Sequence, residues 1–204
     1  IRDVERSRGL GDVYKRQVRA EENYAQITGQ HSNNVVVKNK NGELKIRMGI
    51  ERRFRGANTK VKIFYNNIDK IYVHEGAFVF SKDTINQTAL YVKADEGAKV
   101  SLDVSMTDLS TNTASGAIID VAGNVNLHRA KVNTGGELQA EKLVTDETEV
   151  FLTTGAVADV FAKEELSISV RAGGTVNVHS KTKKIVESKL AGGSINYLYE
   201  KSGL

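Results

Sequence analysis

The chain has 204 residues, with 29 Lys and Arg against 25 Asp and Glu, a formal net charge of +4, and neither cysteine nor proline. The lack of cysteine excludes disulfides, thiolate nucleophiles and cysteine-ligated metals, and no apolar run is long enough to span a membrane. The small positive charge gives no reason to expect nucleic acid as a partner, and the length suits one domain with a sizeable core.

The first segment, residues 1–17, shows no pattern that continues downstream. When residues 12–17 (DVYKRQ) are back-translated, they match the mosaic end of a transposase-based sequencing adaptor, and the residues before them fit the rest of that adaptor. We interpret residues 1–17 as a translated adaptor, not native protein, and set them aside. This segment holds five Lys or Arg and three Asp or Glu, so the net charge falls from +4 to +2 without it. We expect the native domain to begin near Val18, with its own N-terminus missing.

Residues 18–66 are predicted to form an incomplete β cap. Residues 35–48 contain two β-type runs around Asn41 and Gly42, and Asn-Gly is the strongest short signal for a hairpin. A polar, basic loop over residues 49–59 follows, and then a strand over residues 61–65.

An internal repeat dominates residues 67–204, with one glycine recurring every 18 to 21 residues. The glycines are Gly76, Gly97, Gly116, Gly135, Gly155, Gly173 and Gly192. Self-similarity at a period near 19 residues indicates a solenoid. We place each glycine at a corner between two strands, because glycine adopts positive φ without strain. The glycines are therefore predicted to be structural and to bind no ligand.

Strand alternation follows every corner glycine. The third residue after the glycine is apolar, as in Val79, Val100 and Ile119, and the next residue is usually polar. Alternation of this kind places the apolar side chain in a core and the polar one in water. A second strand precedes the glycine in most units, as with Ile168 and Val170. A third short face is suggested by three apolar pairs: Val125 and Leu127, Leu143 and Val144, and Ile185 and Val186. We therefore predict a single all-β domain, a parallel β-helix of about seven turns.

The candidate binding residues lie on the outside of this helix. One expected outer column has one member per turn: Asp120, Gln139, Asp159, Asn177 and Asn196. A few residues beyond their glycines, three lysines could form a basic ladder along a corner that meets anionic glycans: Lys142, Lys163 and Lys181. The four histidines, His31, His74, His128 and His179, lack metal-ligand spacing. We expect no catalytic residue, metal or cofactor.

Three further motifs follow one another along the chain: residues 41–46 (NGELKI), residues 60–73 (KVKIFYNNIDKIYV) leading into the first glycine, and residues 186–194 (VESKLAGGS). Their order resembles the auto-transporter adhesin head GIN domain family of the Bacteroidetes. The resemblance extends from about residue 20 to the end. It implies an exported protein, often lipid-anchored or periplasmic, with a right-handed β-helical body and no known catalytic residues.

Three functions follow as hypotheses. The first is an exported, non-enzymatic protein of the periplasm, outer membrane or cell surface of a Gram-negative bacterium. It would act as an adhesin or structural protein that binds a glycan, a cell-envelope component or another copy of itself, without nucleic acid and without a membrane span. The second is a cytosolic polymerising scaffold that resembles bactofilins. The third is a carbohydrate-active β-helix enzyme, which would need facing carboxylates in a groove.

Overall fold

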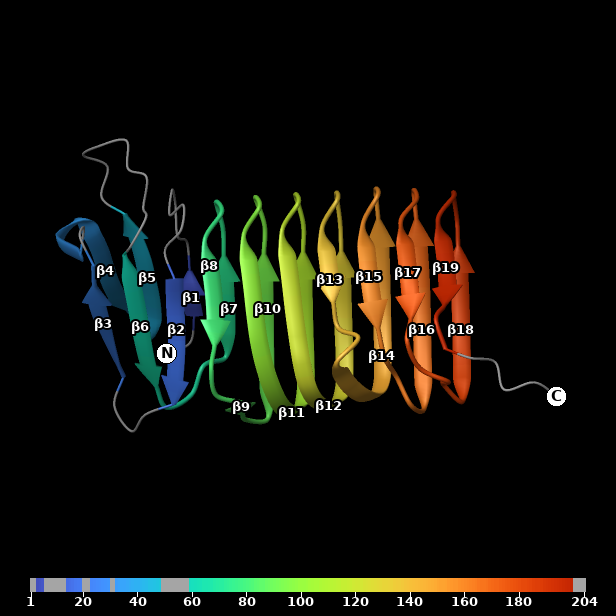
Figure 1. Ribbon diagram of the computed structural model, residues 1–204, viewed down its shortest axis with the longest axis horizontal. Helices are drawn as coiled ribbons and strands as arrows, with labels where there is room; N and C mark the ends of the chain where they lie inside the picture. Colours follow the sequence, from blue (N-terminus) through green and yellow to red (C-terminus); the bar gives the residue numbers. More distant parts are fainter. Residues whose placement is uncertain (1–2, 6–13, 20–22, 30–31, 49–58, 200–204) are drawn as a thin grey trace.

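The computed structural model describes residues 3–5, 14–19, 23–29, 32–48 and 59–199. These residues form a β-solenoid of about seven turns, which is preceded by a cap of strands (Figure 1). The cap contains β1 (Asp3–Glu5), β2 (Tyr14–Arg19), β3 (Tyr24–Thr28), the 3-10 segment η1 (Ser32–Asn34), β4 (Val35–Lys40), β5 (Glu43–Met48) and β6 (Lys60–Tyr65). No α-helix occurs in the described part of the chain. The all-β fold predicted from the repeat is confirmed.

The solenoid consists of strands of 2 to 15 residues joined by tight turns and bends. Its strands are β7 (Lys70–Val73), β8 (Phe78–Ser81), β9 (Ile85–Asn86), β10 (Ala89–Ala94), β11 (Lys99–Thr113), β12 (Ile118–Val132), β13 (Glu137–Gln139), β14 (Leu143–Thr153), β15 (Val157–Val160), β16 (Glu165–Arg171), β17 (Thr175–Val178), β18 (Lys184–Lys189) and β19 (Ser194–Tyr197). All of their pairings with one another are parallel. Parallel pairing arises because each turn lies directly over the one before it.

Two long faces make up the flattened cross-section. The upstream sheet contains the strands that precede each glycine: β7, β10, the C-terminal halves of β11 and β12, β14, β16 and β18. The downstream sheet contains those that follow it: β8, the N-terminal halves of β11 and β12, β13, β15, β17 and β19. The predicted alternation is observed, because Val79, Val100 and Ile119 stack in register and are buried.

The tight turns between the two sheets lie at the predicted glycines. In the turn from His74 to Ala77, the Ala77 N–H donates to the His74 carbonyl at 3.2 Å, and Gly76 has a φ of 71°. Glu75, which precedes the glycine, also has a positive φ of 54°. Two consecutive positive φ values define a type I′ turn, whose twist suits adjacent β-strands. The sequence reasoning identified the glycine but missed the positive φ of the residue before it.

The opposite edge of the cross-section is a wider bend. Here the short segment 104–106 pairs with residues 85–86 on one side and 123–125 on the other, and residues 123–125 pair in turn with 143–145. The predicted third face therefore exists around Val125 and Leu143. It was wrongly extended to Ile185 and Val186, because both lie in β18 of the upstream sheet and pair with Leu166 and Ser167.

The cap continues both sheets. β5 joins the upstream sheet through β1, which pairs with β5 and β7, and β6 joins the downstream sheet through β2, which pairs with β6 and β8. The antiparallel β4–β5 hairpin turns at Asn41 and Gly42, which have φ values of 53° and 82°. The predicted Asn-Gly hairpin is thus confirmed. Ile46 and Ile63 of the cap are fully buried and belong to the same hydrophobic cluster as the solenoid core.

Candidate functional site

The predicted outer column lies on the outward side of the downstream sheet. Backbone register places its members next to one another in successive turns: Asp120, Gln139, Asp159, Asn177 and Asn196. Their side chains bond to neighbours on the same face. Ser101 donates to Asp120 at 3.1 Å, and Asn196 donates to Asn177 at 3.0 Å. The column is therefore an ordered array of carboxylates and amides.

Histidine and apolar side chains flank this array. A distance of 2.6 Å separates His179 Nε2 from Asp159 Oδ1. The neighbouring row of outward positions contains Phe78, Ile118 and Val157, which are half-buried. Lys99 and Glu137 occupy the same row in the turns between them. Sequence reasoning considered only the polar column. Because successive side chains of a strand point to opposite sides, the residues next to each buried residue face outward. Counting along the strands in this way would have identified the outward apolar positions from the sequence.

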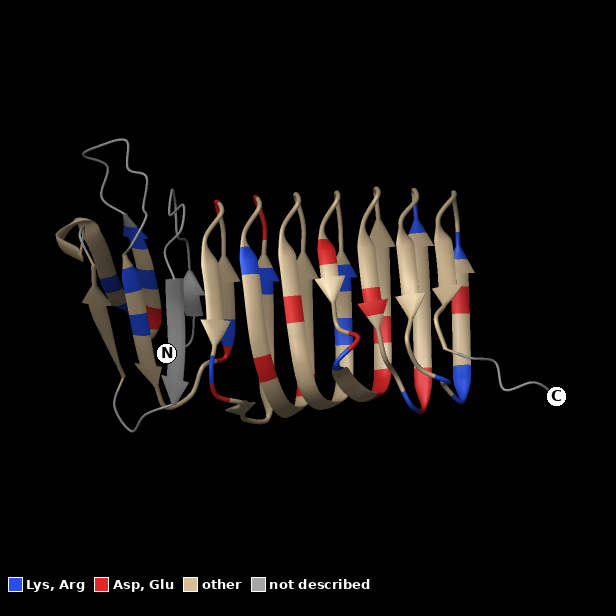
Figure 2. Cartoon of the chain, in the orientation of Figure 1, with Lys and Arg blue, Asp and Glu red and all other residues tan. Residues whose placement is uncertain are grey.

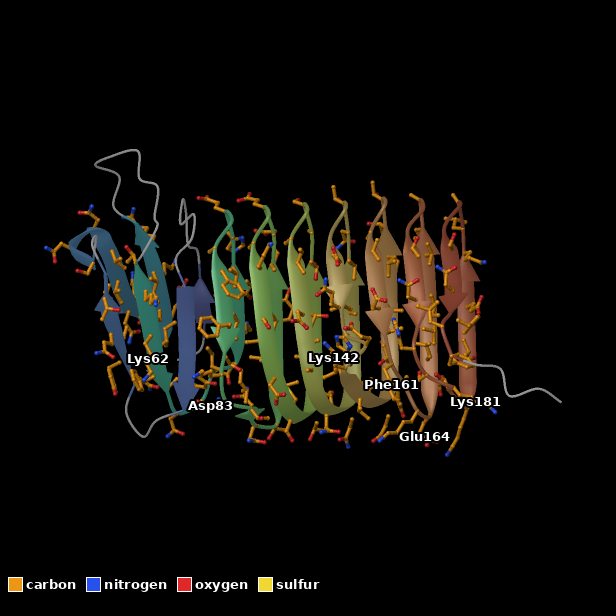
Figure 3. All side chains as sticks on the ribbon, viewed as in Figure 1. Lys62, Asp83, Lys142, Phe161, Glu164 and Lys181 are labelled. Carbon is orange, nitrogen blue, oxygen red and sulfur yellow. The ribbon has the colours of Figure 1, made fainter. Side chains whose placement is uncertain are left out.

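The three lysines lie in the bend region, away from the glycine turns. Figure 3 labels Lys142 and Lys181 in the lower half of the solenoid, together with Phe161 and Glu164. Lys142 is 76% exposed and lies 3.9 Å from Glu141. The Lys183 N–H donates to the Lys163 carbonyl at 3.0 Å. The residue that lies beside Lys163 in the next turn is therefore close to Lys183 in the sequence. Lys181 is displaced along the chain from that position.

The upstream sheet has a groove on its outer side, which sequence reasoning did not anticipate. Its volume is about 450 Å³, and it extends from β10 across β11, β12 and β14 to β16. The outward side chains that line it are Tyr91, Ser110, Asn112, Arg129, Lys131, Glu149, Phe151, Ser167 and Ser169. The groove combines two aromatic rings, two cations and small hydroxyl side chains, a composition that suits binding better than catalysis.

The charge distribution on the outside is mixed. Figure 2 shows Lys and Arg interspersed with Asp and Glu along the solenoid. In the groove, Arg129 lies 3.3 Å from Asp108 and 3.8 Å from Glu149. The mixed pattern agrees with the low net charge, and the described residues on the side shown form no continuous basic stripe of the kind that binds nucleic acid.

One histidine is inside the solenoid. His128 is 1% exposed, and its Nε2 lies 2.9 Å from the hydroxyl of the buried Thr111. Burial lowers the pKa of His128 to about 4, because the charged imidazolium would lose its hydration. His128 is therefore a neutral core residue at pH 7. His74 contacts Asp95 in a half-buried pair, and His31 lies outside the described residues. No group of three or more metal-binding side chains occurs among the residues that the structure describes.

The last turn differs from the others in its inward positions. Glu187 and Lys189 pair with the buried Ile168 and Val170, so their side chains project from the inward side of the sheet. The Tyr197 hydroxyl donates to Glu187. Burial and this carboxylate raise the pKa of Tyr197 to about 12. Two charged residues thus occupy positions that are apolar in the preceding turn.

The fold and these surfaces define a class: a β-solenoid repeat protein that displays side chains in register on flat outer faces. The family model described as "Putative auto-transporter adhesin, head GIN domain" matches residues 9–181. The chain belongs to this family. No relative is found among curated proteins, and none of the described helices is long and apolar enough to cross a membrane.

Solved structures share the fold at low sequence identity. A "putative adhesin" from Bacteroides fragilis NCTC 9343 superposes with a TM-score of 0.83 at 16% identity, covering 95% of this chain and 89% of that one. A "putative adhesin" from Parabacteroides merdae ATCC 43184 gives a TM-score of 0.63 at 13% identity, with coverages of 92% and 89%. A "putative lipid binding protein" from Parabacteroides distasonis ATCC 8503 gives 0.59 at 16%, with coverages of 92% and 90%.

Proposed function

We propose that this chain is an exported, non-enzymatic protein of the cell envelope or cell surface, which binds partners through its outer faces. Membership of the adhesin family supports a binding role. The observation that carries the proposal is the register of the outward side chains, as in the Asp120, Gln139 and Asp159 column. Backbone pairing holds such an array rigidly, so little conformational entropy is lost when a partner binds.

Localisation and binding are tested together. The full coding sequence is recovered from the source DNA and expressed in a Gram-negative host, which is then fractionated and treated with protease as intact cells. We expect an upstream signal peptide or lipobox, recovery in the envelope fraction and protease access from outside. We also expect the purified chain to bind isolated envelope polysaccharide or intact cells. A protein confined to the cytosol would contradict export.

The competing scaffold function depends on stacking at the ends of the solenoid. A further turn placed on β18 would bury Glu187 and Lys189, and burying charges is costly unless they are fully paired. Inward charges on an edge strand also oppose pairing between molecules. This observation favours the envelope protein over a filament that grows through this end. Filaments in electron micrographs of the purified chain, together with a coding sequence that lacks an export signal, would support the scaffold.

An enzymatic function needs carboxylates placed on both sides of a substrate. Glu149 is the one acidic residue among the described residues that line the upstream groove. On the downstream sheet, Asp120 and Asp159 are separated by the turn that contains Gln139. We expect no release of reducing ends when the chain is incubated with envelope polysaccharides. Measurable release would identify a carbohydrate-active enzyme instead.

A further inference from the structure

The groove on the upstream sheet is bounded by two aromatic side chains that lie three turns apart. Register runs from Tyr91 to Ser110, then to Arg129, and then to Glu149, which is two residues before Phe151 in the same strand. Neighbouring strands are separated by about 4.8 Å and two residues of a strand span about 6.6 Å, so the two aromatic positions are about 16 Å apart. The length of the groove suits a short oligomer better than a single small molecule.

Contacts with neighbouring residues hold each of the two rings. The Asn112 amide donates to the Tyr91 hydroxyl at 3.5 Å, and the Tyr72 ring lies 5.7 Å from the Tyr91 ring. The Arg171 guanidinium lies over the Phe151 ring, 5.2 Å from its centre. Both aromatic residues are half-buried, so each ring is held in place while part of its surface stays open. Fixed aromatic surfaces bind apolar ring faces at a low entropic cost.

Small hydroxyl side chains separate the larger ones. Ser110 lies beside Tyr91 in the next turn, while Ser167 and Ser169 lie beside Glu149 and Phe151. These three serines leave space above the backbone and offer donors and acceptors for ligand hydroxyls. Alternating apolar rings and hydroxyl partners match a molecule that has apolar faces and polar edges, as sugars have.

The two long edges of the groove differ in charge. On one side, Lys131 pairs with Phe151 in register, and the Arg171 guanidinium lies 5.2 Å from the centre of the same ring. Neither cation has a carboxylate within 4.0 Å among the described residues. On the other side, just beyond the lining residues, one row of positions contains Asp108, Leu127, Glu147 and Glu165, and Asp108 and Glu165 are paired with Arg129 and Lys184. A ligand therefore meets cations beside Phe151 and carboxylates along the opposite edge.

We propose that this groove binds a carboxylated oligosaccharide. A sugar ring stacks on Phe151, and its carboxylate accepts hydrogen bonds from Lys131 and Arg171, which are stronger than neutral ones because both partners are charged. Hydroxyl groups on the other edge donate to Glu149, which lines the groove. The acidic row repels a continuous polyanion such as nucleic acid, whose binding depends on neutralising many phosphates. This inference rests on the proposed binding function and gives it a ligand class.

The test uses three defined sugars with the purified chain. Isothermal titration and ligand-observed NMR measure the binding of 3′-sialyllactose, trigalacturonate and lactose at millimolar concentrations, where single-site sugar binding is detectable. We expect at least one of the two acidic sugars to bind at least tenfold more tightly than lactose. The two acidic sugars distinguish a sialic-type carboxylate from a uronic-type one. Equal binding of lactose, or no binding by either acid, would overturn the proposal.

Matched variants locate the site. Phe151→Ala should weaken binding of the acidic sugar at least tenfold, and Lys131→Gln several-fold. Phe80→Ala and Lys99→Gln, both on the downstream sheet, are the controls and should leave binding unchanged. Phe151→Leu retains apolar volume without an aromatic face, so it reports the loss of stacking if the alanine variant unfolds. Binding that is insensitive to changes at both Phe151 and Lys131 would show that the groove is not the site.

The outcomes also separate this inference from the proposed function. If cells or envelope polysaccharide bind wild-type protein and the groove variants equally well, the binding function stands and the groove assignment fails. If the acidic sugar binds in the groove but the protein stays in the cytosol, export fails and the groove assignment stands.

Discussion

At the scale of single residues, most of the tight turns hold a non-glycine residue at positive φ, and the glycine that follows does not remove the energetic cost of that conformation. Six non-glycine residues just before the corner glycine have φ between 46° and 56°: Glu75, Glu96, Ser115, Thr134, Thr154 and Ala172. A side chain at positive φ costs about 1–3 kcal/mol. Positive φ often marks functional sites, but repetition in successive turns identifies it here as a requirement of the type I′ turn.

Replacing one of these residues by asparagine should stabilise the protein, because asparagine tolerates positive φ better than alanine does. For Ala172→Asn, at φ 56°, we expect a gain on the order of 0.5–1 kcal/mol in the free energy of unfolding, part of the cost at such positions. Urea denaturation measures it. Ala191 also precedes a Gly-Gly pair but lacks positive φ, so Ala191→Asn is the matched control. An equal gain at both positions would refute the turn explanation.

His128 makes stability dependent on pH. The unfolded chain takes up a proton near pH 6.5, whereas the buried side chain has a pKa of about 4. Acid therefore favours unfolding: stability is lost as pH falls through 6.5, and the loss is complete near pH 4. The difference corresponds to about 3 kcal/mol.

The loss attributed to His128 is measured by urea denaturation between pH 7 and pH 4. His128→Gln, which can still bond to Thr111, should show a smaller loss than the wild type across this range. His179→Gln, at the surface, should retain the full loss. Identical pH profiles for wild type and His128→Gln would mean that His128 does not cause the acid sensitivity.

At the scale of elements, the last upstream strand has a charged inward side. Strands β7, β10, β14 and β16 place uncharged, mostly apolar residues inward, whereas β18 has Glu187 and Lys189 there. The final strands β18 and β19 each pair with only one other strand among those described. Such an edge is a template for association unless something opposes it.

We expect Glu187→Ile combined with Lys189→Val to promote association at this edge. Removing both charges leaves an apolar inward face on a strand that pairs with only one other strand among those described, so a second molecule can stack there. Sedimentation velocity should show a concentration-dependent increase in mass for the double variant. Ser188→Val, on the outward side of the same strand, is the control and should leave the mass unchanged. An unchanged mass for the double variant would show that these charges do not guard the edge.

At the scale of the whole molecule, the cap is linked to the solenoid by β1 and β2. These strands pair with β5 and β6 on one side and with β7 and β8 on the other. All of β1 and residues 14–17 of β2 fall within residues 1–17, which we interpret as a translated adaptor, and that interpretation stays a prediction. Sequencing of the source DNA tests it directly.

A chain that begins at residue 18 should lose this link. Hydrogen exchange should become faster in β3 to β6, because their ladder to the solenoid is broken, while β11 to β17 keep their protection. Repeat proteins behave in this way because each unit depends mainly on its neighbours. A control chain ending at residue 199 should exchange like the full chain in both regions. Unchanged protection of the cap in the shortened chain would show that cap packing alone holds it.

The sequence by itself determined the repeat, the corner glycines, the buried and outward positions of most strands and the Asn-Gly hairpin. These features depend on local periodicity and on backbone preferences that short stretches of residues express. Family membership was also predictable from the order of the motifs.

Only the tertiary structure decided which outward residues from different turns lie together. The groove joins Tyr91 to Phe151, which are 60 positions apart, and the length of each loop sets the register between turns. Loop length also explains two differences from the expected arrangement. Lys181 does not lie beside Lys163, and Ile185 and Val186 lie in the upstream sheet, one of the two long faces. The sequence showed that His128 was isolated from other ligands, whereas its burial, and with it the lowered pKa, came from packing between turns.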